Sequence, residues 1–292
     1  QPDLIWGFTR SGSQSKRLVD STRGGSSRLY SDLTSSESTG TATISSFDSD
    51  GFTATGGAFN NDSGKTCGAW CWKANGGTTT SDSSGDITVT RQTNDVAKFS
   101  ILTYTGSGSS GNTIAHGLGV KPAMTIIKQR NSSNGWNVWH QGNNNGDYDS
   151  FGELNGNASW YQNQGSNGPF SAAPGTDYLT LTAYGQVNGS SNTYVSYVWA
   201  DVEGMQKFGS FEGNANNDGP FIYTGFRPRM VFIKSVDTTA PWMVWDTARA
   251  TFNPINISLA WNDSLTESDY TGYPIDVLSN GFKIRTSNAT VN

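Results

Sequence analysis

The sequence predicts an all-β protein built of tandem antiparallel β-sandwich-like repeats, in about three copies, of which the first and the last are incomplete. Three observations predict it. The chain repeats itself, its composition is rich in aromatic and turn-forming residues, and its apolar residues occur in short runs of strand length.

The repeat is clearest in residues 98–128 and 207–234. Both segments begin with Lys-Phe, pass through a loop rich in Gly, Asn and Ser, turn at Pro122 or Pro228, and close an apolar run with Ile-Lys. A clipped copy lies at the start of the chain, where Pro2 takes the place of these prolines, and the spacings are 120 and 106 residues. Self-similarity of this kind predicts three units, 1–97, 98–206 and 207–292.

Further matches extend the repeat. Asp20-Ser-Thr-Arg23 matches Asp246-Thr-Ala-Arg249, Ser49-Asp-Gly-Phe52 matches Ser279-Asn-Gly-Phe282, and Ala69–Ala74 matches Tyr194–Ala200. We interpret the recurring Asp/Arg pair as a salt bridge within each unit rather than a ligand site. The first unit lacks the opening Lys-Phe strand and the third lacks the closing strand, so we expect these residues to be an excerpt of a longer chain.

The composition supports the all-β class. Only 15% of residues are charged, 34% are apolar and 35 are Gly, while Trp, Tyr and Phe number 10, 11 and 14. Low charge with many aromatics argues against a disordered chain, and aromatic runs separated by turn formers are typical of strands. The net charge of −5 argues against nucleic acid as a partner, and no apolar run reaches the length of a membrane span.

The individual elements follow from the same patterns. Asp50-Gly51 and Asn280-Gly281 are hairpin turn signals, and residues 77–86 form the best candidate for a linker. Residues 143–168 are expected to be a long loop, and residues 35–39 and 201–206 to form single helical turns. The predicted strands are 5–8, 87–91, 99–105, 124–128, 137–140, 178–183, 194–200, 221–224, 230–234, 243–246 and 282–285.

Both cysteines lie on one of the Trp-rich strands. Cys67 and Cys71 are four residues apart, so they share a face of the strand at a separation of about 13 Å, too far for a disulfide bond. With no histidine nearby they do not form a zinc site. We expect free, buried thiols.

No catalytic or cofactor site is predicted. Gly106–Gly111 matches the dinucleotide glycine pattern, but no helix follows it to hold a pyrophosphate. His116 and His140 are the only histidines, no nucleophile elbow accompanies them, and no carboxylate pair recurs in all units. Asn145–Asp149 with Glu153 offers oxygen ligands of the kind that calcium prefers, but such loops are commoner without metal, and we predict none.

Most tryptophans are expected to form the core, since they recur in the repeat: Trp6, Trp70, Trp72, Trp136, Trp139, Trp199, Trp242 and Trp245. Aromatic residues beside or within Asn/Gly/Ser-rich loops are candidates for stacking on sugar rings. The predicted glycan-binding residues are therefore Trp136, Trp160, Tyr161, Trp242 and Trp261.

Several segments together resemble a family of tandem-repeat domains in structural proteins of tailed bacteriophages, especially marine phages. The resemblance covers essentially the whole chain, and the string Asp218–Pro228 is its most specific part. The segments are 104–106, 115–119, 201–204, 207–210, 218–228, 246–249 and 278–285. In that family the repeats follow a concanavalin/SPRY-like lectin domain, which this sequence does not contain.

The resemblance implies a non-enzymatic virion protein, a head or tail appendage or fibre component that attaches to host-surface glycans and contacts other virion proteins. A homo-oligomer is expected. A purely architectural capsid or tail protein and, less favoured, a secreted polysaccharide-active enzyme are the alternatives. The three units could also close into a pseudo-threefold prism, in which a neighbouring chain supplies the missing first and last strands.

Overall fold

The computed structural model describes residues 1–40, 44–55, 61, 63–143, 147–267 and 270–292. In these residues the fold is almost entirely antiparallel β-structure, which confirms the predicted class. Among these residues, helical structure consists of the short helix α1 (Gly185–Asn188) and a 3₁₀ turn at Gly165–Asn167. No helix in the described part of the chain is long and apolar enough to cross a membrane.

We use the names first, second and third unit for residues 1–97, 98–206 and 207–292. The first unit contains a sheet of order β3-β2-β1-β6, with strands β1 (Leu4–Thr9), β2 (Arg17–Asp20), β3 (Leu29–Tyr30) and β6 (Cys67–Trp72). A hairpin of β4 (Ile44–Asp48) and β5 (Gly51–Ala54) packs its apolar side chains over Ile5 and Val19.

The second unit carries the largest sheet, of order β13-β12-β11-β15-β9-β8-β7. Its strands are β7 (Thr80–Asp82), β8 (Val89–Asn94), β9 (Phe99–Thr105), β11 (Met124–Gln129), β12 (Trp136–His140), β13 (Gly152–Glu153) and β15 (Thr193–Trp199). A two-stranded sheet pairs β10 (Thr113–Ala115) with β14 (Tyr178–Thr180). Because β7 and β8 extend this sheet, the β8–β9 hairpin crosses the predicted boundary at residue 97.

The third unit has two small sheets. One is ordered β17-β18-β19, with β17 (Met230–Ile233), β18 (Met243–Asp246) and β19 (Leu259–Ala260). The other is ordered β16-β21-β20, with β16 (Phe221–Tyr223), β20 (Ile275–Leu278) and β21 (Gly281–Ile284).

Each predicted strand corresponds to a strand of the structure, and the two predicted turns join β4 to β5 and β20 to β21. Three predictions were wrong. The linker contains β7, which pairs with β8, and the expected helical turn at 35–39 is absent, because Ser38 forms a β-bridge with Arg28 instead. Residues 202–206 do form a single hydrogen-bonded turn, in which the amide of Gln206 donates to the carbonyl of Val202 at 3.0 Å. The repeat also predicts a Lys-Phe strand at 207–211, but the chain there is not a strand. Its counterpart β9 pairs with β15, and the described residues of the third unit include no strand equivalent to β15.

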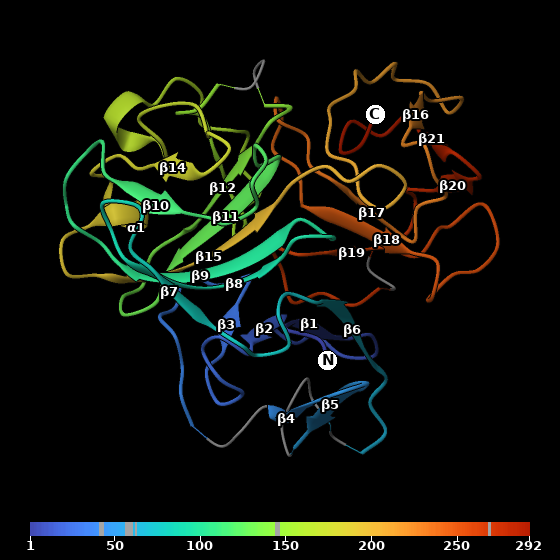
Figure 1. Cartoon of the computed structure of the whole chain (residues 1–292). Helices are drawn as coiled ribbons and strands as arrows, with labels where there is room; N and C mark the ends of the chain where they lie inside the picture. Colours follow the sequence, from blue (N-terminus) through green and yellow to red (C-terminus); the bar gives the residue numbers. More distant parts are fainter. Residues whose placement is uncertain (41–43, 56–60, 62, 144–146, 268–269) are drawn as a thin grey trace.

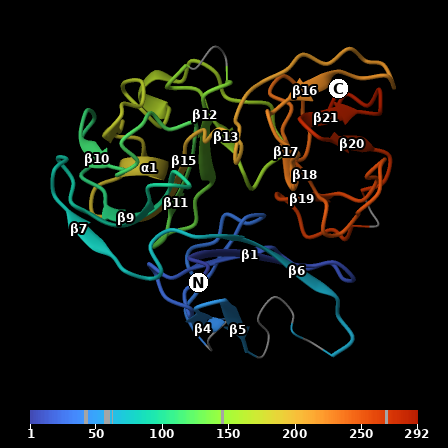
Figure 2. The same cartoon turned by 45° about the vertical axis from the view of Figure 1, so that its right-hand side comes forward.

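The three units surround a common centre, as Figures 1 and 2 show from two directions. The central core draws side chains from every unit, and aromatic pairs mark each junction. Trp6 stacks on Trp261 with ring centroids 4.0 Å apart. The other two junctions hold the pairs Trp72–Trp199 and Trp160–Trp242, both with centroids 6.0 Å apart.

The same backbone hydrogen bond recurs at all three junctions. Each time, an amide that follows β11, β17 or β1 donates to a carbonyl that follows β3, β13 or β19 of the neighbouring unit. The bonds are Asn134 N to Thr34 O (2.9 Å), Ala240 N to Asn157 O (2.8 Å) and Gln14 N to Ser264 O (2.9 Å). The second unit therefore donates to the first, the third to the second and the first to the third, and the three units close into a ring.

Candidate functional site

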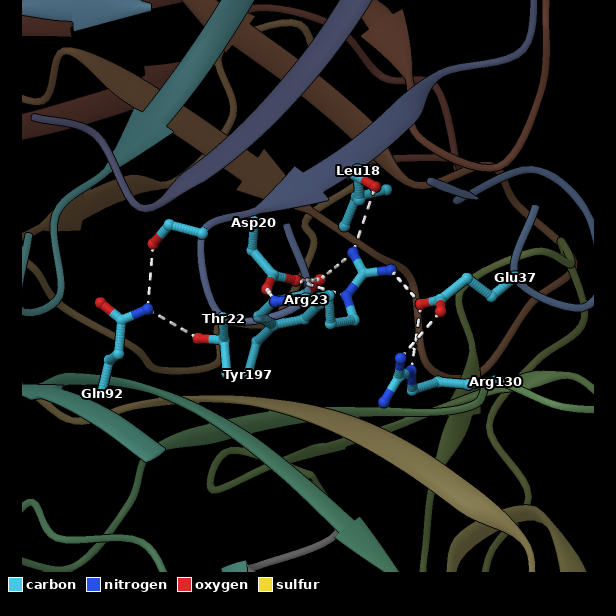
Figure 3. Close-up of polar contacts among 9 residues, drawn as sticks. Leu18, Asp20, Thr22, Arg23, Glu37, Gln92, Arg130 and Tyr197 are labelled. Atoms are coloured by element: carbon cyan, nitrogen blue, oxygen red, sulfur yellow. Dashed lines mark hydrogen bonds and ion pairs between the residues drawn. The ribbon is translucent and has the colours of Figure 1, made fainter. Parts of the chain in front are cut away.

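The matched Asp/Arg pairs form the most prominent polar clusters. Arg23 donates from Nε to Asp20 Oδ2 at 2.6 Å and from its backbone amide to Asp20 Oδ1 at 2.9 Å (Figure 3). The carboxyl of Glu37 accepts from Arg23 Nη1 at 2.6 Å and from Arg130 Nη2 at 2.8 Å, and Tyr197 on β15 donates to Asp20 at 2.7 Å. The cluster thus joins the first unit to the second.

The third unit repeats this arrangement. Arg249 donates from Nε to Asp246 Oδ2 at 2.6 Å and from its backbone amide to Asp246 Oδ1 at 2.9 Å. Glu267 accepts from Arg249 at 3.4 Å and from Arg10 of the first unit at 2.9 Å, and Trp70 Nε1 donates to Asp246 at 3.2 Å. The prediction of salt bridges within the units is confirmed. Since the side chains of both Asp/Arg pairs are at most 9% exposed, these clusters are structural and offer no ligand surface.

The predicted glycan-binding tryptophans require correction. Trp136, Trp160, Trp242 and Trp261 are between 0% and 7% exposed and belong to the central core, so they cannot present a ring face to a sugar. The reason is that the loops beside them are the junctions between units: Trp136 Nε1 donates to Tyr30 O, and Trp242 Nε1 donates to Glu153 O. Of the predicted set, Tyr161 is exposed, at 38%, and it stacks on Phe151.

Exposed aromatic side chains gather elsewhere, on one face of the β16-β21-β20 sheet. Phe221 and Tyr223 alternate with Ile222, so they share a side of β16 while Ile222 packs into the core of the third unit. Their exposed fractions are 44% and 67%. We call this the outer face; it comprises Phe221, Tyr223, Asp276, Leu278, Gly281 and Lys283.

Close approach at Gly281 shapes the outer face. A Cβ on this residue would lie 2.1 Å from the carbonyl oxygen of Ile222 and 2.9 Å from the ring of Phe221. The absence of a side chain therefore lets the Phe221 ring lie over the backbone of β21. Tyr223, directly opposite Gly281 in the ladder, has no neighbouring side chain there to cover its ring.

Charged groups border these aromatics. Lys283, opposite Phe221, pairs with Asp218 at 2.9 Å, and Arg285 pairs with Asp276 at 3.3 Å. The hydrogen bond from Lys283 lowers the pKa of Asp218, so this carboxylate stays ionised at neutral pH. Exposed rings beside carboxylates and cations can stack on the apolar face of a sugar while the polar groups bond its hydroxyls.

The other sequence candidates do not form a site. His116 and His140 lie apart in the fold, and burial lowers the pKa of each to about 4, so both are neutral near pH 7. Cys67 and Cys71 carry no disulfide and are exposed, contrary to the prediction, because the β4–β5 hairpin covers β1 and β2 but not the edge strand β6. In the calcium candidate, Asn145 and Gly146 lie outside the described residues. Within the part of the chain that the structure describes, no cluster of three or more His, Cys, Asp or Glu side chains could hold a metal ion.

Sequence reasoning placed Phe221–Thr224 on a strand but did not identify the outer face. The alternation of two aromatics around Ile222 was the available signal. It could not show which side of the strand faces solvent, since all three side chains are apolar.

The chain belongs to a protein family defined only as a domain of unknown function (DUF7483), whose sequence model matches residues 1–292. Neither the curated proteins nor the solved structures include a match to this chain.

Proposed function

We propose that this protein is a non-enzymatic structural component of a phage virion, part of a head or tail appendage or fibre, and that it binds host-surface glycans through the outer face. The resemblance of its repeats to phage structural proteins supports the virion role. The glycan role rests on the exposed pair Phe221 and Tyr223 beside Lys283 and Asp276.

The proposal includes a homo-oligomer and contacts with other virion proteins. One outer face per chain would bind a sugar weakly, since a small exposed site buries little area. Several copies held together raise the effective concentration at the host surface, so that weak sites add up to firm attachment.

A glycan array probed with the intact protein tests the binding role. Tyr223→Ala and Phe221→Ala should each reduce the signal for a bound glycan about tenfold or more, since each removes a stacking ring. Phe252→Ala is the matched control, because Phe252 is an aromatic residue 85% exposed and outside the outer face. Equal loss in the control, or binding that survives both substitutions, would refute this site.

Immuno-electron microscopy of virions tests the structural role. Label at fibre tips or tail ends supports attachment, and label spread over the head with no glycan binding favours the architectural alternative. Virions without label, together with release of reducing sugar from capsular polysaccharide by the protein, would support the secreted enzyme instead.

A further inference from the structure

We infer that the free edge of β17 is a docking site for a β-strand of another polypeptide, an extended segment of alternating aromatic and aliphatic residues that is followed by an acidic residue. The inference is independent of glycan binding. It depends on one repeated position that a strand fills in two units and that no described strand fills in the third.

The first observation is strand order. β1 lies between β2 and β6, and its counterpart β11 lies between β12 and β15. The third counterpart, β17, pairs with β18 alone among the described strands. All six residues of β1 and of β11 are buried, whereas Met230 and Phe232 of β17 are only partly buried. A strand edge with unpaired amides and carbonyls is a ready template for another strand.

The second observation concerns the contacts that β15 and β6, the strands beside β11 and β1, make with the neighbouring unit. Tyr197 of β15 donates to the Asp20 cluster of the first unit, and Trp70, its counterpart on β6, donates to the Asp246 cluster of the third unit. If the third unit followed the same arrangement, a strand beside β17 would reach the second unit at His140 and Asn143, the counterparts of Asp20 and Arg23. The ring of Phe208 lies at this place now, with its centroid 6.0 Å from that of His140, so an incoming strand would displace the Phe208 side chain.

The third observation is the charge where such a strand would end. After β15, Asp201 accepts a hydrogen bond from Gln141 at 3.1 Å. After β6, the amide of Ala74 donates to Asp3 at 2.7 Å. In the third unit, Thr247 takes the place of Gln141 and Arg229 that of Asp3. A pocket of about 390 Å³ opens there, lined by Arg227, Arg229, Thr247 and Thr251.

This pocket fits a carboxylate. Arg227 and Arg229 are both exposed, and neither forms an ion pair with an acidic side chain of the described residues. Guanidinium groups bind carboxylates through paired, charge-assisted hydrogen bonds, and a threonine hydroxyl can add another. An acidic residue that follows the docked strand, as Asp201 follows β15, would lie between Thr247 and Arg229.

The probe is a synthetic peptide with the sequence of residues 193–201, Thr-Tyr-Val-Ser-Tyr-Val-Trp-Ala-Asp, because this segment fills the equivalent place beside β11. Binding to the intact protein is measured by fluorescence anisotropy, with a scrambled peptide as the control. Hydrogen exchange then locates the site. We expect the amides of β17 that point away from β18 to exchange rapidly in the free protein and to become protected when the peptide binds.

Reversal of the charge on the pocket and on the peptide tests the pocket. Arg229→Glu should weaken binding of the peptide roughly tenfold or more, and a peptide with Lys in place of its final Asp should restore binding to that variant. Lys121→Glu controls for the change of charge, since Ala123, the counterpart of Arg229, is buried: Lys121 precedes Pro122 as Arg227 precedes Pro228, beside an edge that β15 already occupies.

Three results would overturn the inference: no binding at roughly millimolar peptide, protection of amides other than those of β17, or equal weakening by Lys121→Glu. Protection in the free protein of the β17 amides that point away from β18, whether constant or rising with protein concentration, would also overturn it, because the edge would then be occupied already. None of these results bears on the glycan array, so failure here and failure of glycan binding are distinguishable.

Discussion

The junction between the first and second units and the junction between the second and third occupy matched positions but are built from different chemistry. The first joins Asp20, Arg23, Glu37 and Arg130 in one ionic cluster. The second has His140, Asn143, Trp160 and Val236 at the same places, and Trp160 N donates to Val236 O at 2.9 Å, as Glu37 N donates to Arg130 O at 2.7 Å. The backbone contact is the same, and all four side chains differ.

The comparison shows that the backbone geometry of a junction does not depend on ion pairs. Buried ion pairs are costly to desolvate, and well-packed apolar groups can replace them at little cost. The two chemistries differ in what happens when one member is lost. Removal of one ion leaves a buried charge without its partner, whereas loss of an apolar group leaves a cavity.

Arg23→Ala should have the largest effect. It leaves Asp20 and Glu37 buried without their shared cation, so we expect a loss of about 3–5 kcal/mol in the free energy of unfolding, measured by urea denaturation. Arg249→Ala should cost less, since the contact of Arg249 with Glu267 is longer, at 3.4 Å, and Asp246 is slightly exposed. Arg28→Ala, which removes one hydrogen bond to Tyr30, is the control. A smaller loss for Arg23→Ala than for Arg249→Ala would show that burial does not rank the two clusters.

The two junctions should respond to acid in different ranges. Burial lowers the pKa of His140 to about 4, below its unfolded value of 6.5, so the unfolded chain binds the proton first and stability falls as the pH drops from 6.5 towards 4. Burial alone would raise the pKa of Glu37, but bonds from Arg130 and Arg23 lower it overall. Its contribution is therefore complete above the unfolded pKa of about 4.5 and is lost as the pH falls through the lower, folded value.

The pH response is checked with His140→Asn. This variant should lose stability less steeply than the parent between pH 6.5 and 4, by about 1–3 kcal/mol over the range, as read from denaturation midpoints at each pH. His116 also has a pKa lowered to about 4 by burial, so part of the slope remains in the variant. An unchanged slope would show that His140 is not buried as a neutral side chain.

Trp160 and Trp242, which pack together at the junction between the second and third units, should tolerate substitution unequally. Trp242 Nε1 donates to the carbonyls of Glu153 and Gly156 at 3.0 and 3.1 Å, whereas Trp160 Nε1 is buried with no partner among the described residues. We expect Trp242→Phe to cost about 2–3 kcal/mol and Trp160→Phe to lie within about 1 kcal/mol of the parent, because removal of an unpaired donor offsets the lost packing. Equal costs would mean that packing alone decides.

The smallest effect is expected for the partly exposed ion pair between Arg10 and Glu267. Arg10 is 32% exposed in its pair with Glu267, so Arg10→Ala should cost at most about 1 kcal/mol, less at high salt. Calorimetry at low and high salt measures it. A cost above that of Arg249→Ala would show that closure between the third and first units depends on this exposed pair.

Local patterns in the sequence were sufficient for much of the fold. Period-two alternation and turn residues located the predicted strands and both hairpin turns, and the matched Asp/Arg pairs indicated the ionic clusters correctly. These features depend on residues a few positions apart, so the sequence displays them directly.

The tertiary structure decided what depends on distant partners. Trp136 directly precedes one predicted strand and Phe221 begins another, yet Trp136 is fully buried at a junction and Phe221 lies on the outer face, because the position of the neighbouring unit determines which side of a strand is covered. Residues 207–211 begin with the Lys-Phe of β9 but are not a strand, because β9 pairs with β15 and the described residues of the third unit include no equivalent of β15. By itself the sequence determined where strands can form; only the packing of the three units decided which strands form and which aromatic side chains remain exposed to solvent.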